Sequence, residues 1–377
     1  MVSVRIAMAT LAAVASCGRL HFDGEEVLAV DAAITPPSLA EKLPCNTATA
    51  LATTPGGLSL DSMTWLSDAS GDWIIGVEHT ASGAHPFRRH RVTDSTAGLQ
   101  VADLGIAIDS QDPWLPTYLP IAGGWLVGLV ESTGAGGYVM RTGDGLSSPT
   151  PPIVGTRIAD FTSGSRALAP LSGDFVLVGS SGGTLGAQII DASGAARGPI
   201  ITLASGNLDQ SSIASTGTRV GVVWRETISG DCQLAVFDQD LALQRGPLTL
   251  DLVSCHEPQI AWIPATNRFA VVATDNNDPS VWYATWTDQL VAVDAPRKLA
   301  DVATDAFITP SADGAWVTWI NTSGGAAIRS IHLGATDTAL SALGAVNNSH
   351  ALTRVGTTTV SLWENAGRVL AARLCTQ

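Results

Sequence analysis

A short apolar run led by an aromatic or branched residue recurs along the chain and constrains the fold more than any other feature. A turn signal rich in Gly and Asp precedes most copies, as Gly173 and Asp174 precede Phe175. Apolar residues on both faces are typical of a strand that is covered on both sides. Successive copies start 44 to 52 residues apart, at Trp73, Trp125, Phe175, Val220, Phe269, Trp316 and Val360.

Aspartates that follow the next expected strand repeat with nearly the same period. An Asp side chain can bond its own backbone two residues on and so start a turn. These aspartates lie 47 to 50 residues apart, at Asp94, Asp144, Asp191, Asp238, Asp288 and Asp337. A near-fixed period that contains only strand and turn signals predicts an all-β fold, a seven-bladed β-propeller with four strands in each blade.

The seventh repeat ends one strand short of the others. Its second strand starts at Val360, so the turn that should follow its third strand falls at the chain end, Gln377. The only remaining strand-like segment is 44–54, at the other end of the chain. We therefore expect this N-terminal strand to complete the last blade, which would leave no open edge between the first and last blades.

Four cysteines test this arrangement. Cys375 ends the third strand of the last blade and Cys45 starts the expected N-terminal strand, so the two should be neighbours in an antiparallel pair. Cys232 and Cys255 begin and end neighbouring strands of the fourth blade. Of the three connectivities that four cysteines allow, this topology selects Cys45–Cys375 and Cys232–Cys255. Metal binding is the alternative, but the chain lacks the Cys-x-x-Cys spacing of common zinc sites.

The N-terminal region reads as an export signal. Arg5 supplies a positive charge, a short apolar stretch follows, and residues 14–17 (Val-Ala-Ser-Cys) resemble the lipobox of bacterial lipoproteins. The resemblance implies that residues 1–16 are a signal peptide and that Cys17 carries acyl chains, which would anchor the protein stably in a membrane. An ordinary secretory signal is the alternative. Residues 17–43 show no periodicity and predict a flexible tether, so the propeller should span 44–377.

The repeats also resemble the WD-repeat-like propellers of exported bacterial proteins. The segments 256–262 and 309–316 carry this likeness best. Each contains a polar residue and a Pro or Ser, followed by an alternating strand or a Gly/Asp turn that leads to an aromatic residue. The Gly-His and Trp-Asp pairs of true WD repeats and full sialidase Asp-boxes are missing. The resemblance therefore implies a fold and no particular activity.

A third set of periodic residues, all carboxylates, stands at the leading end of the expected inner strands. If they face the mouth of the channel they could bind a cation or a cationic ligand, whereas the alternative is a structural turn role repeated in each blade. These candidates are Asp61, Asp112, Asp160, Asp209, Glu257 and Asp305. A compact oxygen-rich turn adds Asp275, Asn277 and Asp278 as weaker Ca²⁺ candidates, although a plain solvated loop explains them equally. No other cofactor is expected.

Charge and motifs restrict the function classes. A net charge of −14 argues against nucleic-acid binding, and the chain lacks a nucleophile elbow, a His-Glu-x-x-His motif, a phosphate loop and a dinucleotide fingerprint. We expect a monomeric envelope lipoprotein whose propeller is a binding or scaffolding module for an envelope protein or a glycan. Gly18 after the acylated cysteine favours the outer membrane, on either face. The alternative is a glycosidase or lyase that uses the carboxylates at the channel mouth.

Overall fold

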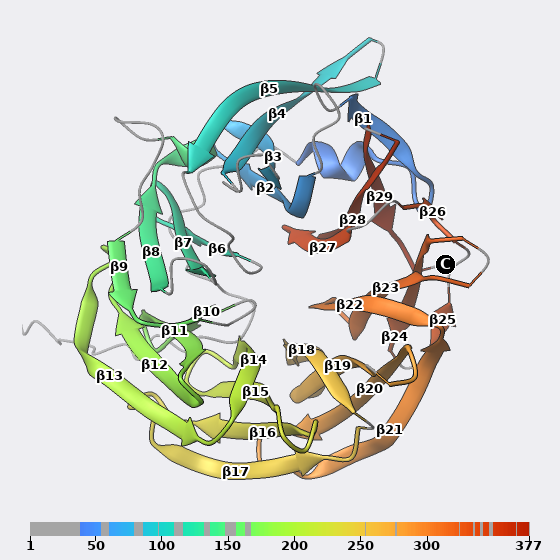
Figure 1. The fold of residues 1–377 in the computed structure, drawn as a ribbon. Coiled ribbons are helices and arrows are strands. Elements are labelled where there is room, and N and C mark those ends of the chain that lie inside the picture. Colours follow the sequence, from blue (N-terminus) through green and yellow to red (C-terminus); the bar gives the residue numbers. More distant parts are fainter. Residues whose placement is uncertain are drawn as a thin grey trace, which may run out of the picture.

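The computed structural model describes residues 38–53, 60–78, 86–96, 98–108, 116–131, 136–147, 156–162, 167–252, 254–275, 277–323, 325–334, 336–339, 342–346, 350–366 and 368–376, with only the backbone at 52–53 and 60–62. The described strands form seven antiparallel sheets around a central channel, as Figure 1 shows. This is the seven-bladed β-propeller that the repeat predicts. Within the described ranges, no helix has the length and apolar character needed to cross a membrane.

Each blade runs from an inner strand at the channel to an outer strand at the rim (Figure 1). Blade 1 contains β2 (Leu60–Asp68), β3 (Gly71–Glu78), β4 (Phe87–Ser95) and β5 (Gly98–Ile108). Blade 2 contains β6 (Thr117–Ile121), β7 (Gly124–Glu131), β8 (Gly136–Thr142) and β9 (Thr156–Ala159), with the 3-10 helix η3 (Asp144–Leu146) before β9. Blade 3 contains β10 (Leu168–Leu171), β11 (Asp174–Ser181), β12 (Thr184–Ile190) and β13 (Ala196–Ser205).

The remaining blades follow the same plan. Blade 4 contains β14 (Leu208–Ser215), β15 (Val220–Glu226), β16 (Cys232–Phe237) and β17 (Leu243–Leu250). Blade 5 contains β18 (Cys255–Ile263), the 3-10 helix η4 (Pro264–Thr266), β19 (Arg268–Asp275), β20 (Ser280–Thr287) and β21 (Ala292–Asp301). Blade 6 contains β22 (Ala303–Pro310), β23 (Ala315–Asn321), β24 (Ala327–Leu333) and two short strands that both pair with β24, β25 (Thr338–Ala339) and β26 (Gly344–Ala345). Blade 7 contains β27 (His350–Val355), β28 (Thr358–Asn365), β29 (Arg368–Leu374) and, as its outer strand, β1 (Thr49–Thr53).

The recurring apolar run forms the second strand of every blade, and it is buried on both faces. All residues of β7 are buried, whereas β13 at the rim is mostly exposed. The buried side chains gather into seven clusters, each of which lies between two neighbouring blades. The protein thus has a ring of inter-blade cores in place of one central core, and each junction is stabilised by apolar burial.

The periodic aspartates form turns in blades 3 and 4, as predicted. The Asp191 carboxylate accepts hydrogen bonds from the backbone N–H groups of Ser193 (2.8 Å) and Ala195 (3.1 Å). Asp238 accepts from Asp240 (3.0 Å) and Ala242 (2.9 Å) in the same way. These bonds satisfy backbone donors in the turn between the third and outer strands.

The ring closes through the N-terminal strand, as the short seventh repeat predicts. β1 pairs antiparallel with β29, and a disulfide joins Cys45 to Cys375 beside this pair. Asn46 mimics a further strand residue, because its side-chain amide donates to the Cys375 carbonyl (3.0 Å) and accepts from the Cys375 N–H (3.0 Å). The second predicted bond, Cys232–Cys255, is also formed, but Cys255 begins β18 of blade 5 and does not end the outer strand of blade 4, so the bond joins two blades.

The folded part starts earlier than the sequence indicated. Residues 38–43, assigned above to the tether, form the 3-10 helix η1 (Leu39–Lys42) and its flanks. Ala40 and Leu43 are 0% and 1% exposed in the cluster between blades 7 and 1, and Lys42 pairs with Asp94 at 2.5 Å. Two buried apolar residues are too few to produce a readable period. The rest of the expected tether, the leader and Cys17 lie outside the described residues.

Candidate functional site

The structure describes the side chains of four of the six predicted channel-mouth carboxylates. Asp112 and the side chain of Asp61 lie outside the described part. Asp160 follows β9, is 83% exposed and pairs with Arg157 at 2.8 Å. Asp209, Glu257 and Asp305 lie near the start of the inner strands β14, β18 and β22.

These last three carboxylates do not all occupy equivalent positions, although the three strands carry a bulge at the same place. In β14 the bulge follows Asp209, which pairs with Arg225 across the ladder. In β18 and β22 the bulge contains Glu257 and Asp305, whose φ values are 47° and 49°. The equivalent of Asp209 in β18 is therefore His256. The even sequence spacing suggests a ring of matching carboxylates, but Asp209 stands one position before Glu257 and Asp305 relative to the shared bulge, and such an offset redirects a side chain.

What the structure brings together instead is a polar cluster between blades 4 and 5, which contains Asp209, Gln210, Arg225, His256 and Glu257. The side-chain carbonyl oxygen of Gln210 accepts hydrogen bonds from the Glu257 backbone N–H (3.0 Å) and from the Arg225 guanidinium (3.4 Å). Its amide nitrogen donates to Nε2 of His256 (3.0 Å). His256 accepts there, so its neutral ring carries the proton on Nδ1, 4.0 Å from Oε2 of Glu257. Gln210 thus links the two blades.

The pKa values of Asp209, His256 and Glu257 are shifted in the direction that favours their neutral forms. Burial raises the pKa of Asp209, and burial together with Asp305 raises the pKa of Glu257. Burial and the nearby charge of Arg225 lower the pKa of His256, which agrees with a neutral ring that accepts from Gln210. These directions follow from the cost of holding a charge in a partly dry site.

The structure groups no set of three or more His, Cys, Asp or Glu side chains that could hold a metal ion within the ranges it describes. In the Ca²⁺ candidate turn, a carboxylate oxygen of Asp275 accepts from the N–H groups of Asn277 (2.8 Å) and Asp278 (3.3 Å). The Asn277 amide donates to Ser254 (2.9 Å), and Asp278 pairs with Lys298 (3.2 Å). The turn and the ion pair already use these groups.

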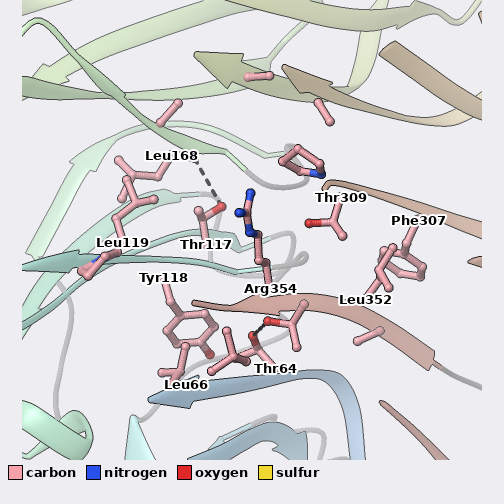
Figure 2. A pocket seen from close by; sticks show the side chains of 18 of the residues that line it. Thr64, Leu66, Thr117, Tyr118, Leu119, Leu168, Phe307, Thr309, Leu352 and Arg354 are labelled. Carbon is pink, nitrogen blue, oxygen red and sulfur yellow. Dashed lines mark hydrogen bonds between the residues drawn. The ribbon is translucent and has the colours of Figure 1, made fainter. Parts of the chain in front are cut away.

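A cavity of about 560 Å³ occupies the channel and is lined by the inner strands of all seven blades (Figure 2). Its walls are mainly apolar, and the carboxylates Asp209, Glu257 and Asp305 do not line it. Hydroxyl groups interrupt the apolar surface at several places. The hydroxyls of Thr64 and Thr353 lie 3.1 Å apart and connect blades 1 and 7.

Arg354 is the one charged side chain among the described residues that line this cavity. Figure 2 shows it extending from β27 into the cavity. It stands at the next-to-last paired position of its inner strand, opposite Thr359. The matching positions of the other six blades are uncharged: Ser67, Pro120, Pro170, Ala214, Trp262 and Thr309.

Arg354 was not among the predicted site residues, although the sequence contains a signal for it. An alignment of the seven repeats on the turn that ends each inner strand puts one cation where all other repeats have a neutral residue. The predicted carboxylates instead share the leading end of that strand and recur from blade to blade. A residue that occurs in a single blade falls outside such a search.

Comparisons with known proteins agree on the fold. No protein-family model matches the chain, and no curated protein does. Among solved structures, the WD40 domain of Toxoplasma gondii coronin superposes with a TM-score of 0.58 at 11% identity, over 89% of this chain and 88% of that one. The AfRom2 CNH domain gives 0.53 at 8% identity over 88% and 100% of the two chains.

A Lactobacillus plantarum protein gives a TM-score of 0.51 at 12% identity, over 78% of this chain and 87% of that one. Identities this low establish a shared fold and leave ligands and activities open. The chain has the fold of a seven-bladed β-propeller, similar to that of the coronin WD40 domain.

Proposed function

We propose that this chain is a binding module of the bacterial envelope that takes a small ligand in its central channel. The observation that carries the proposal is the cavity of about 560 Å³ to which every blade contributes. Its volume falls within the roughly 300–1,000 Å³ of typical ligand pockets. Its lining, apolar walls with a few polar groups, is also typical of such pockets. A propeller is well suited to this role, since the blades hold the channel walls rigidly.

The envelope part of the proposal rests on the sequence. Residues 14–17 resemble a lipobox, so Cys17 would anchor the propeller in the membrane, with the outer membrane favoured. The two disulfides support export, because such bonds persist in oxidising compartments. The module would therefore meet ligands from the periplasm or from the cell surface.

The neutral dye N-phenyl-1-naphthylamine tests channel binding, since its fluorescence rises in an apolar site. We expect saturable binding of one dye per protein. Thr117→Phe places a ring in the channel and should abolish binding, whereas Thr93→Phe, at an exposed position of β4, should not. Thermal melting of both variants controls for folding. Equal binding by the wild type and by Thr117→Phe would contradict the proposal.

A second candidate is hydrolysis or lyase chemistry at the mouth of the channel. The observation that favours it is Glu257, whose pKa is raised by burial and by Asp305, the direction that a general acid requires. A panel of p-nitrophenyl glycosides tests it. Asp313→Asn, at an exposed position, is the control. An enzyme would be supported if the protein turns over a glycoside, Glu257→Gln abolishes this turnover and Asp313→Asn preserves it. Absence of turnover across the panel would leave the binding module as the stronger proposal.

A further inference from the structure

A second cavity, of about 320 Å³, lies at the junction of blades 5 and 6, which are neighbours in Figure 1. We propose that it binds a neutral saccharide, whose hydroxyl groups contact the Tyr283 hydroxyl and two ion pairs on the cavity wall. These ion pairs are Arg268–Asp294 and Arg297–Asp337. None of the described residues that line this cavity also lines the channel. The inference therefore adds a second site and does not depend on the proposed channel function.

The first argument is a buried hydroxyl group that lacks a hydrogen-bond partner. Tyr283 of β20 lines the cavity and is 5% exposed. Among the residues that the structure describes, none forms a hydrogen bond with its hydroxyl. Burial raises the pKa of this hydroxyl, and the charges of both ion pairs act on it as well, which places the group at the charged wall of the cavity. A buried tyrosine hydroxyl usually has a partner, and a ligand in the cavity would supply it.

The second argument is the set of polar atoms that the ion pairs leave unused. Nη1 of Arg268 lies 3.4 Å from Oδ2 of Asp294, and Thr285 donates to the same oxygen (2.8 Å). Nη1 of Arg297 lies 2.5 Å from Oδ2 of Asp337. Within the described part of the chain, each pair thus uses one guanidinium nitrogen and one carboxylate oxygen. Further N–H donors therefore stand beside a second carboxylate oxygen in each pair.

The third argument concerns the charge of the ligand. Each charge of the two pairs already faces an opposite charge, so an ionic group of a ligand would have to displace a partner. A hydroxyl group both donates and accepts hydrogen bonds. Neighbouring hydroxyls of a sugar ring can accept from the guanidinium of a pair and donate to its carboxylate, and such charge-assisted bonds are stronger than neutral ones. The mixed signs of the wall thus favour a neutral saccharide over an ion or a zwitterion.

Contacts inside and between the blades hold the site in place. Arg297 stands opposite Tyr283 in the ladder between β20 and β21, and its guanidinium lies 5.5 Å from the centroid of the tyrosine ring. Asp337, which precedes β25, brings blade 6 into the site through its pair with Arg297. The volume of about 320 Å³ lies at the lower end of the roughly 300–1,000 Å³ of ligand pockets, which suits a small ligand.

Saturation-transfer-difference NMR tests the site with the methyl glycosides of glucose, galactose, mannose and N-acetylglucosamine. We expect at least one of these glycosides to bind the wild type saturably. Tyr283→Phe removes only the hydroxyl group and should weaken this binding about three- to tenfold, the size of one hydrogen bond. Asp294→Asn should weaken it at least as much, because it removes a charged acceptor. This second variant does not threaten the core, since the Asp294 side chain is 57% exposed.

Tyr138→Phe is the matched control, because it removes a hydroxyl from β8 of blade 2, outside the cavity. This control should bind the glycoside as the wild type does, and so should Thr117→Phe, which fills the channel. Equal affinity of the wild type, Tyr283→Phe and Asp294→Asn would overturn the inference. Loss of binding in Thr117→Phe would also overturn it, since the saccharide would then occupy the channel. If none of these glycosides binds the wild type, the saccharide site is refuted and the channel proposal is unaffected.

Discussion

Replacing Cys45 and Cys375 together with Ser removes the covalent closure of the ring and leaves its non-covalent closure in place. The bond spans 330 residues, whereas Cys232–Cys255 spans 23. Loop-closure entropy assigns these two crosslinks about 6 and about 3 kcal/mol, and losses measured for native disulfides run at about 2–5 kcal/mol. We therefore expect the double substitution at the ring seam to lower the free energy of unfolding by about 4–5 kcal/mol.

The substitution is informative because the native contacts survive it. Cys45 is exposed, β1 keeps its pairing with β29, and the two hydrogen bonds of Asn46 use the backbone of residue 375. The loss of stability should therefore arise because the unfolded chain gains conformational freedom without the bond. It should appear mainly as slower refolding. Urea unfolding followed by tryptophan fluorescence measures the free energy, and stopped-flow refolding measures the rate. A loss below about 1 kcal/mol would refute the reasoning, and so would a loss confined to faster unfolding.

Deleting residues 44–54 goes further, because it removes the outer strand as well as the bond. β29 then becomes an unpaired edge, and Leu51 leaves the cluster between blades 7 and 1. We expect aggregation or proteolysis that begins at the C-terminal end. A deletion variant with unchanged stability would show that blade 7 holds together without β1.

The other predictions concern the N-terminal region and the polar cluster. Cys17→Ser should lose labelling by a fatty-acid analogue, and equal labelling of this variant would remove the lipoprotein proposal. Deleting 18–37 should leave the melting temperature within about a degree, whereas extending the deletion through Leu43 should cost about 2–4 kcal/mol in urea unfolding, since two buried side chains are lost. Glu257→Gln should stabilise the protein more at pH 7 than at pH 4. The raised pKa of Glu257 means that the folded state binds the proton of this carboxyl group more tightly than the unfolded state does. The carboxyl group therefore does not destabilise the fold below the ordinary carboxyl pKa. Its destabilising effect grows as the pH rises from there through the pKa that Glu257 has in the folded state. Melts of wild type and variant at both pH values check the sign, and an equal difference at each would contradict it.

The sequence predicts the fold well because the propeller repeats its signals. Runs such as the one that starts at Trp73 need burial on both faces, and this need leaves a pattern in every blade. The missing strand of the last blade and the cysteine pairs follow from counting strands. Single local events leave no such pattern. The η1 segment escapes notice because only Ala40 and Leu43 anchor it.

The candidate site is harder to predict than the fold for two physical reasons. The paired positions of β14 and β18 repeat after 47 residues, from Asp209 to His256, whereas Asp209 and Glu257 are 48 residues apart, so a step that looks regular hides a change of position. Among the described residues that line the channel, Arg354 alone carries a charge, and a property carried by one blade is invisible to a search for repeated residues. Repetition reveals the scaffold, whereas the departures from it reveal the site.

The seam between β1 and β29 also decides how the protein responds to mechanical load. A pull on the chain ahead of Ser38 first meets the contacts of η1 and the Lys42–Asp94 pair, and then reaches Cys45. The disulfide passes the force directly to Cys375, so β1 beyond it stays unloaded. Hydrogen bonds of the closing strand would not be sheared or unzipped until a covalent bond failed. A pull from the N-terminal side therefore bypasses β1 and is carried by the ladder between β29 and β28.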